Sequence, residues 1–600
     1  MILQALYEYE QRRQKVGTGI PTGCGDVEFK FLVEIDSTGR FHQFYDMQEE
    51  QVGPKGKSFL KGKRYFVPDT VSRTSGVKAK VLWDNAKYLL GAEIDKEKKI
   101  HTAQDDQGLR QRLDAFIQET KDCLKRSKDR TLSKEIQAII NFYENPEGLD
   151  AALKDLTLGN VLEAGGNLTF RLIDGDLPVP AQEAARNLAA FEPSEEGVCL
   201  ITGQRAPLAR IHSDFLIRGG RKQTGASLVS CQKDSGYDSY YKEQGYNAPV
   251  SQAAAFDYAS GLKQLLASEK NKAIIGKDTY VFWSVPKDAP IGGENPASEG
   301  NFRAVLQGDP DKQVGRLKVV FDHIRQGTDL VVEKGRFCLL GLTANSARIA
   351  VRLWRVDSTE HFAANLRRHL EDTAIDAYGG QVVNFPLDRI LWAMALDGKI
   401  ESLPPNIPSG LLSSVVDGVP YPLAGFQRAI VRIRAEQEVR PELASLLRGT
   451  LNRWRTSAGE QKEVFGVKLD DASQDPSYVL GRVFSILESI QRIAQGELNK
   501  SITSRFLGAA ASTPGIVFPK LFKLSVHHLQ KISQDRLPRA VWWKNKLASV
   551  MEGVGEFPRQ LNLYEQGKFF LGYYHQNQDV SAKKEDLQLN NDEERKEQQR

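Results

Sequence analysis

Residues 480–494, with the sequence LGRVFSILESIQRIA, carry the clearest secondary-structure pattern of the chain. The apolar side chains are separated by three, four, three and four residues, at Leu480, Val483, Leu487, Ile490 and Ala494. This spacing places them on one face of a helix. Similar apolar faces recur within 521–532, 541–550 and 561–571. The sequence therefore predicts an all-α helical bundle over residues 478–580.

The segments on either side of this bundle are polar. Residues 456–477 have few apolar positions and are typical of a linker. Residues 581–600 carry mixed charges and many Gln and Asn side chains. Such a composition cannot bury enough apolar surface to offset the entropy of ordering the chain. We therefore expect a disordered tail over 581–600.

The N-terminal end of the chain has strand patterns instead. Residues 26–35 alternate between apolar and polar side chains, which is typical of a half-buried strand. Two strand-like runs between 337 and 355 flank a turn, as in a hairpin. The predicted fold class is α+β, with a β-rich N-terminal unit that has helical insertions, a mixed middle region and the C-terminal bundle. The predicted segments before the linker are a β-rich unit with basic loops at 1–105, a mainly helical segment at 106–196, a mixed α/β segment at 197–290, and a hairpin with helices at 301–455.

Composition limits the class of protein. The chain has 600 residues, more than one hydrophobic core holds, and its net charge is only +4. The five cysteines are scattered without a Cys-x-x-Cys pair, which indicates a reducing compartment and no zinc finger. We find no apolar run of roughly 18–20 residues and no basic leader before an apolar core. We expect a cytoplasmic protein without a membrane segment.

We find none of the common catalytic motifs in the sequence. The run 53–58 resembles the end of a phosphate loop, but Gln51 occupies the position where the first glycine is required. The nine histidines are dispersed, and the adjacent His527 and His528 diverge by about 100° on a helix. We therefore expect no enzymatic activity, no cofactor and no metal. The alternative is a metal-dependent nuclease with a dispersed active site, for example one that includes Asp322 and His323.

Positive charge is concentrated in three places. Residues 55–87 contain nine Lys and Arg against two Asp, in a Gly- and Ser-rich context. Lysines neutralise phosphates, and glycines let the backbone approach a groove, so this loop region is a candidate for duplex DNA binding. Within it, the run Arg73-Thr74-Ser75-Gly76 is the predicted groove contact. The remaining candidates are Lys55, Lys57, Lys61, Lys63, Arg64, Lys78 and Lys80. The alternative is a solvated loop that keeps an edge strand soluble.

The second basic cluster comprises Arg218, Arg221, Lys222 and Gln223, with glycines beside it. Arg and Gln side chains can read base edges, although a mobile basic hairpin is the alternative. The third lies in the bundle, where residues 478–575 contain thirteen Lys and Arg against six Asp and Glu. The residues expected to face outward and to bind a nucleic-acid strand are Arg482, Arg492, Lys500 and Arg505. A scaffold that binds acidic proteins is an alternative to nucleic-acid binding.

Short motifs along the whole chain resemble those of the large-subunit family of type I-C CRISPR Cascade. They are found at 1–7, 199–203, 225–230, 239–240, 247–251, 282–283, 340–348, 419–422, 481–494, 510–514 and 571–575. The resemblance rests on the order and spacing of these motifs together.

The resemblance implies a subunit at the base of an RNA-guided surveillance complex in antiviral defence, next to the 5′ end of the crRNA and in contact with the Cascade backbone subunits. Its N-terminal part would read the protospacer-adjacent motif (PAM) in target double-stranded DNA and help to open it. It would stabilise the R-loop and offer a docking surface to the trans-acting helicase-nuclease that cuts the DNA.

The resemblance also implies that the C-terminal part is similar to the Cascade small subunit, lines the displaced or target strand, and can be produced separately. Further small-subunit copies would then be partners. The four methionines, Met1, Met47, Met394 and Met551, are all distant from the start of the bundle. We therefore predict that a separate product begins at a non-AUG codon, with Val464, Val467 and Val479 as candidates.

Overall fold

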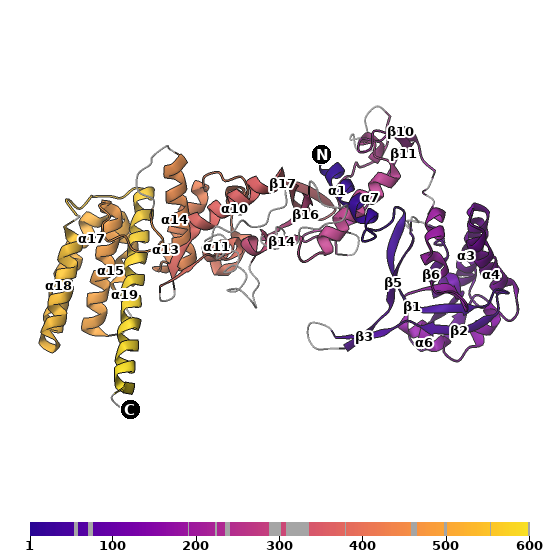
Figure 1. The fold of residues 1–600 in the computed structure, drawn as a ribbon, viewed down its shortest axis with the longest axis horizontal. Helices are drawn as coiled ribbons and strands as arrows, with labels where there is room; N and C mark the ends of the chain where they lie inside the picture. The colour runs from indigo at the N-terminus through magenta and orange to yellow at the C-terminus, as the bar shows by residue number, and fades with distance from the viewer. Residues whose placement is uncertain are drawn as a thin grey trace. The chain divides into compact units, whose positions relative to one another are not determined.

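The computed structural model describes residues 1–52, 58–69, 76–189, 191, 193–222, 225–233, 241–286, 302–307, 335–377, 380–457, 465–496, 501–552 and 554–597. The chain groups into two compact units (Figure 1). Unit 1 comprises Met1–Phe215 and Ser227–Gln264, and unit 2 comprises Leu216–Ala226 and Leu265–Arg600. These units are larger than the segments predicted from the sequence.

The main sheet of unit 1 is built around the long strand β1 (Cys24–Ile35), which confirms the strand predicted at 26–35. Its N-terminal half pairs antiparallel with β5 (Lys63–Pro68), and its C-terminal half pairs with β2 (Phe41–Asp46). On the other side, β9 (Asn167–Leu172) runs parallel to β1 and also pairs with β6 (Trp83–Asn85). Strand β9 lies inside the segment predicted to be mainly helical.

Helices cover one face of this sheet. Phe31, Val33 and Ile35 of β1 share a hydrophobic core with side chains of α3 (Gln107–Arg126) and α4 (Arg130–Glu144). Figure 1 shows both helices beside the sheet. Asp106 and Asp129 cap their N-termini by accepting hydrogen bonds from Leu109 and Leu132 backbone N–H groups.

The other elements of unit 1 are short, apart from its first and last helices. They are α1 (Ile2–Lys15), β3 (Glu49–Val52), β4 (Ser58–Lys61), α2 (Ala86–Leu89), β7 (Ala92–Ile94), β8 (Ile100–Thr102), α5 (Leu149–Lys154), α6 (Leu158–Ala164), β10 (Glu196–Val198), β11 (Arg205–Pro207), β12 (Asp214–Phe215) and most of α7 (Gln252–Ala267). A buried polar cluster joins α1 to α7, because Gln11 and Gln14 both donate to the Asp257 carboxylate.

Unit 2 contains an antiparallel sheet in the order β17-β16-β15-β14. Strands β16 (Gly335–Asn345) and β17 (Arg348–Ser358) form the hairpin predicted between 337 and 355. Strand β15 (Asp278–Pro286) pairs with β16 and with β14 (Lys272–Ile275). The buried residues of this sheet, among them Tyr280, Phe282 and Leu339, belong to a core that continues through the helices of the unit.

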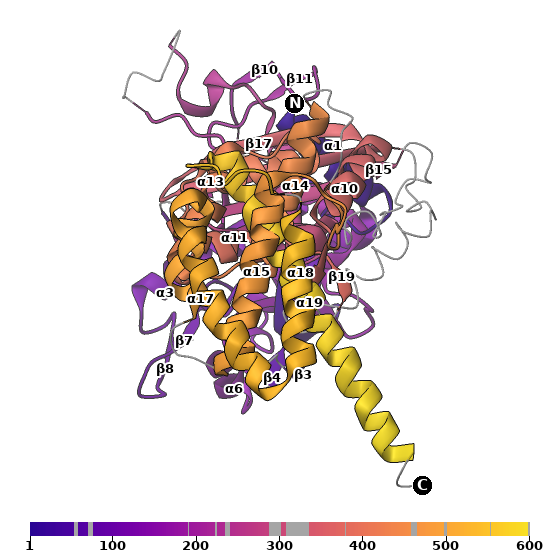
Figure 2. The same cartoon turned by 90° about the vertical axis from the view of Figure 1, so that its left-hand side faces the viewer.

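After the sheet, unit 2 is mainly helical. Its further elements are α10 (Thr359–Thr373), β18 (Ile375–Ala377), β19 (Gln381–Val383), α11 (Leu387–Met394), α12 (Asn406–Val416), α13 (Leu423–Glu436), α14 (Pro441–Ser457), α15 (Pro476–Gln495), α16 (Ile502–Ser512), α17 (Pro514–Asp535), α18 (Leu537–Met551) and α19 (Leu563–Glu597). The helices α15, α17, α18 and α19 lie side by side in both views (Figures 1 and 2), which confirms the predicted all-α bundle. The predicted α+β fold class is thereby confirmed.

The segments predicted on either side of the bundle differ from expectation. Within 456–477, seven of the thirteen described residues from 465 to 477 are exposed, but the segment is anchored to the helices. The Arg448 side chain donates to the Phe465 and Gly466 carbonyls, and Phe465 is buried in the same core as the bundle. Helix α19 also continues to Glu597, through most of the tail predicted as disordered. Residues 582–597 are rich in Lys and Glu, which favour helix even without an apolar face.

Among the residues that the structure describes, no helix is both long enough and apolar enough to cross a bilayer.

Candidate nucleic-acid interface

A two-stranded ribbon formed by β3 and β4 carries the first basic region. Glu49 pairs with Lys61 and Gln51 pairs with Phe59 across the ribbon. The segment that connects the strands holds the candidates Lys55 and Lys57, which lie outside the described residues. Phe59 and Leu60 are 50% and 58% exposed, so the ribbon presents two large apolar side chains beside its basic residues.

Gly62 sets the direction of this ribbon. It lies between β4 and β5, where a Cβ atom would come within 2.3 Å of the Phe29 carbonyl oxygen. Its backbone N–H donates to the Glu28 carboxylate at 2.9 Å. Because a glycine allows this close approach to β1, the end of β4 lies against the main sheet.

Two predicted DNA contacts have acidic partners within the sheet. Arg64 lies 3.0 Å from the Asp26 carboxylate and donates to the Asp26 carbonyl. The Lys80 ammonium lies 2.6 Å from Asp69 and 4.0 Å from the centre of the Trp83 ring. Both contacts stabilise the sheet, so these side chains are less available for phosphates than their sequence positions suggest.

Lys61 is half-buried, whereas three other residues of this region face solvent. Lys63 is exposed and lies above the Tyr65 ring, at 5.5 Å from its centre. Lys78 and Gly76 are also exposed, and Gly76 has a φ of 79°. Of the predicted groove contact, Arg73, Thr74 and Ser75 lie outside the described residues.

The second basic cluster is held against the turn between β16 and β17. Arg221 donates its backbone N–H to the Ser346 carbonyl at 3.1 Å. Arg218 forms an exposed ion pair of 2.6 Å with Glu401. The side chains of Arg221 and Lys222 are exposed, and Gln223 lies outside the described residues.

Arg482 does not face outward, which corrects the prediction for the bundle. It is 3% exposed, and its guanidinium donates to the Asp470 and Asp471 carbonyls, each at 3.1 Å. It also donates to the Gln576 side chain. The reason is that α15 is the central helix of the bundle, so a position away from its apolar stripe is also covered. Arg482 therefore fastens the segment before α15 to the bundle.

Of the other residues predicted to bind a strand, Arg492 and Arg505 are exposed, as expected. Lys500 lies outside the described residues.

The strongest positive surface of the bundle is formed by α17 and α18. Residues 514–551 contain a single acidic residue, Asp535. The seven basic residues of this hairpin are Lys520, Lys523, Lys531, Arg536, Arg539, Lys544 and Lys546. Six of them are exposed, and Lys546 is half-buried. We name this the α17–α18 surface. A charge count over the whole bundle does not reveal this surface, because it averages α17 and α18 with the less basic helices.

Exposed apolar groups accompany this charge on α18. Trp542 is 52% exposed, and Leu537 and Val541, which lie one turn apart on α18, are also exposed. Trp543 points inward and its ring lies edge-to-face against that of Trp542, at 4.8 Å between ring centres. The pair Trp542-Trp543 within a basic helix was a sequence signal for this surface, because an exposed indole among cations is typical of single-strand binding.

Over the described parts of the chain, no three His, Cys, Asp or Glu side chains are grouped as metal ligands would be. Asp322 and His323 lie outside those parts.

Comparison with known proteins places the chain in one family. The family model described as CRISPR-associated protein (Cas_Csd1) matches residues 6–581. A comparison with curated protein sequences finds no match. The family match extends over both units and the bundle. The chain therefore belongs to the Cas_Csd1 family of CRISPR-associated proteins, and is a large subunit of type I-C Cascade.

Proposed function

We propose that this chain is a non-catalytic subunit that binds target DNA within the Cascade complex. The observation that carries this proposal is the α17–α18 surface, where six exposed basic residues on two neighbouring helices accompany the exposed Trp542. Basic side chains neutralise successive phosphates, and an aromatic ring stacks on an unpaired base of any sequence. This combination suits a single strand better than a duplex, whose bases are already stacked.

The ribbon β3–β4 is the proposed site of PAM recognition in unit 1. Lys61 and Lys63 supply positive charge, and Phe59 and Leu60 supply apolar side chains at an exposed edge. Apolar side chains of this kind can enter between base pairs and unstack them. The ribbon can therefore hold duplex DNA through its lysines and help to open it. The proposed groove contacts remain Arg73, Thr74, Ser75 and Gly76, of which only Gly76 is among the described residues.

The remaining proposed roles rest on the resemblance to large subunits of type I-C Cascade. Within the complex, this chain would contact the crRNA and the backbone subunits, stabilise the R-loop, and offer a docking surface to the trans-acting helicase-nuclease. Its bundle would act beside separate small-subunit copies. We place all of these activities in the cytoplasm.

The test uses the assembled complex with crRNA and a labelled target duplex. Binding is measured by fluorescence anisotropy at several salt concentrations. We expect Lys61→Ala combined with Lys63→Ala to weaken duplex binding and to lower the salt slope by roughly 0.9 for each phosphate that the variant no longer neutralises. Trp542→Ala should weaken retention of the opened target by about tenfold, and Trp542→Phe should restore most of it.

The matched control is Lys96→Ala combined with Lys99→Ala. Both lysines are exposed in unit 1, between β7 and β8, which form a two-stranded sheet separate from the β3–β4 ribbon. Equal binding by the control, the ribbon variants and the Trp542 variant would show that neither surface holds DNA.

A further inference from the structure

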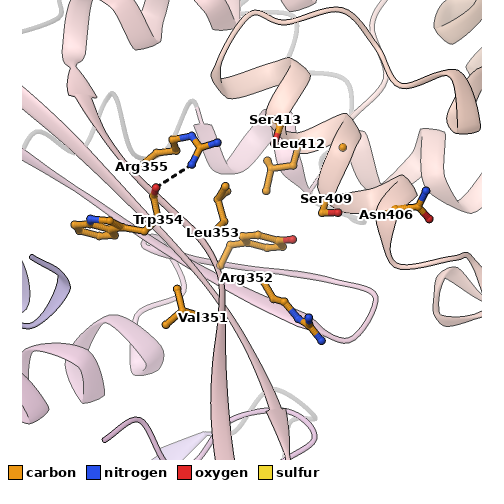
Figure 3. A pocket seen from close by; sticks show the side chains of 11 residues that line it. Val351, Arg352, Leu353, Trp354, Arg355, Asn406, Ser409, Leu412 and Ser413 are labelled. Atoms are coloured by element: carbon orange, nitrogen blue, oxygen red, sulfur yellow. Dashed lines mark hydrogen bonds between the residues drawn. The ribbon is translucent and has the colours of Figure 1, made fainter.

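Unit 2 has a cavity of about 500 Å³ between β17 and α12 (Figure 3). This size is within the range of small-ligand pockets. One wall is the β17 segment from Val351 to Arg355, and the other is α12, with Asn406, Ser409 and Ser413. Leu353 and Leu412 approach each other across it in Figure 3.

A β-bulge shapes the wall formed by β17. Gly341 pairs with Leu353 and Leu342 pairs with Val351, so Arg352 is an extra residue in the ladder. Bulges re-aim a side chain relative to a regular strand. The exposed Arg352 side chain lies at one edge of the cavity, and its Nε donates to the Thr343 hydroxyl at 3.4 Å. Among the described residues, no carboxylate lies within ion-pair distance of Arg352, so its charge is available to a ligand.

Arg355 lies at the opposite edge and is held in a fixed orientation (Figure 3). Its Nε and Nη2 donate to the two Asp417 carboxylate oxygens at 2.9 and 3.1 Å. Its Nη1 donates to the Trp354 carbonyl at 3.1 Å. The remaining N–H groups of the guanidinium can still donate to a ligand. Asp417 neutralises this arginine, whereas Arg352 is linked to a carboxylate, that of Asp278, through the Thr343 hydroxyl, which donates to Asp278.

The polar groups that line the cavity are those that bind nucleic-acid backbones. Phosphate and sugar oxygens in protein complexes are contacted by Arg, Ser and Asn side chains. Here Arg352, Asn406, Ser409 and Ser413 line one cavity, whose lining includes no Asp or Glu. Ser409 donates its hydroxyl to the Pro405 carbonyl, which leaves its oxygen free to accept from a sugar hydroxyl.

We propose that this cavity holds one phosphodiester group of a single-stranded nucleic acid, with Arg352 on the phosphate. The α12 side chains Asn406, Ser409 and Ser413 contact the adjoining sugar. The inference rests on the proposed function, because it adds a backbone contact to a subunit that binds nucleic acid. RNA and DNA share this chemistry, so the experiment has one arm for each.

The test replaces single phosphates by neutral methylphosphonates, in the crRNA in one arm and in the target strand in the other. Each substituted strand is bound to complexes that contain the wild-type chain or Arg352→Gln. We expect one position at which the neutral group weakens wild-type binding about tenfold but leaves Arg352→Gln binding unchanged. The arm that contains this position identifies the strand. Arg348→Gln is the matched control, since Arg348 is on the same strand and does not line the cavity.

A second pair of variants tests the cavity without changing an arginine. Ser413→Glu places a carboxylate opposite Arg352 and should weaken binding about tenfold, whereas the neutral Ser413→Gln should have much less effect. If Arg352→Gln and Ser413→Glu bind as the wild type does, and no position distinguishes them, the cavity holds no phosphodiester. If the Trp542→Ala variant still binds the target more weakly than the wild type in that case, the proposed function stands. If it binds equally well, both the proposed function and the cavity proposal are wrong.

Discussion

Gly481 of α15 and Gly572 of α19 each leave room for the backbone of the other helix. A Cβ atom on Gly481 would come within 1.9 Å of the Phe569 carbonyl oxygen, and one on Gly572 would come within 2.0 Å of the Tyr478 carbonyl oxygen. The two helices therefore cross with their backbones in contact. This crossing places the Tyr478 hydroxyl 2.9 Å from Nδ1 of His575. It also lets Nε of Arg482 donate to Oε1 of Gln576 at 3.3 Å.

Gly481→Ala and Gly572→Ala should both destabilise the bundle. The added methyl group meets backbone atoms, which cannot move aside as a side chain can, so we expect a loss of about 3 kcal/mol or more. Gly425→Ala in α13 is the control, because a Cβ there has its nearest neighbours at 3.7 Å. Urea unfolding measures the difference. Equal stability of the three variants would mean that α15 and α19 do not cross at these glycines.

His575 makes the bundle sensitive to acid. Burial, together with the positive charge of Arg448, lowers the pKa of His575 to about 3, below its ordinary value of about 6.5. Between these two pH values the unfolded chain binds a proton that the folded chain does not, so stability is lost as the pH falls. The loss at pH 5 is about 2 kcal/mol.

The measurement is the free energy of unfolding at pH 7.5 and pH 5.0. His575→Gln keeps a hydrogen-bonding group near Tyr478 but does not titrate, so its stability should change less between the two pH values. The exposed His42 on β2 is the control, and His42→Gln should retain the wild-type dependence. The same pH dependence in all three proteins would contradict the assignment.

Glu10 should make unit 1 more stable, rather than less stable, as the pH falls. Burial raises the pKa of Glu10 to about 6, although the Ile20 backbone N–H donates to its carboxylate. The folded chain therefore holds a proton that the unfolded chain releases between about pH 4.5 and 6, and stability increases as the pH falls through this window. We expect Glu10→Gln to raise the free energy of unfolding by up to about 2 kcal/mol at pH 7.5, and by much less at pH 4.5. A destabilised variant at pH 7.5 would mean that the charged form is needed there.

Arg482 should affect stability rather than strand binding. Arg482→Ala leaves the Asp470 and Asp471 carbonyls and the Gln576 side chain without their donor. The expected cost is about 2–3 kcal/mol. Arg492→Ala, on the exposed side of the same helix, should cost less than about 0.5 kcal/mol. Thermal unfolding separates the two. A stable Arg482→Ala variant with weakened DNA binding would instead support a role for this arginine on a strand.

Local patterns predicted the elements that depend on neighbours in the sequence. The alternation at 26–35 and the paired runs near 345 indicated β1 and the hairpin β16–β17, because strand periodicity is a local property. The parallel pairing of β9 with β1 joins segments more than 130 residues apart, and the short run Asn167–Leu172 has no partner nearby in the sequence. The burial of Arg482 depends in the same way on α19, which follows it by about ninety residues.

In the nucleic-acid interface, too, local sequence patterns predicted some features, while others depend on contacts between distant segments. Charge counting found the basic regions, but the acidic partners of Arg64 and Lys80 appear only when β1, β5 and the segment before β6 are brought together. The helical period alone places Leu537 and Val541 on one side of a helix. It does not show that this side of α18 faces solvent, since that depends on how α17 and α15 pack against the other side.

The packing of the bundle also discriminates among the predicted starts of a separate C-terminal product. A chain that begins at Val479 lacks Asp475, which caps α15 and lies 2.6 Å from Lys568. It also lacks Asp471, the ion-pair partner of Arg482. A chain that begins at Val467 keeps both, and one that begins at Val464, which lies outside the described residues, also keeps the buried Phe465. We therefore expect products from Val464 and Val467 to unfold at higher urea concentrations than the product from Val479. Equal midpoints would show that the segment before α15 does not stabilise the bundle.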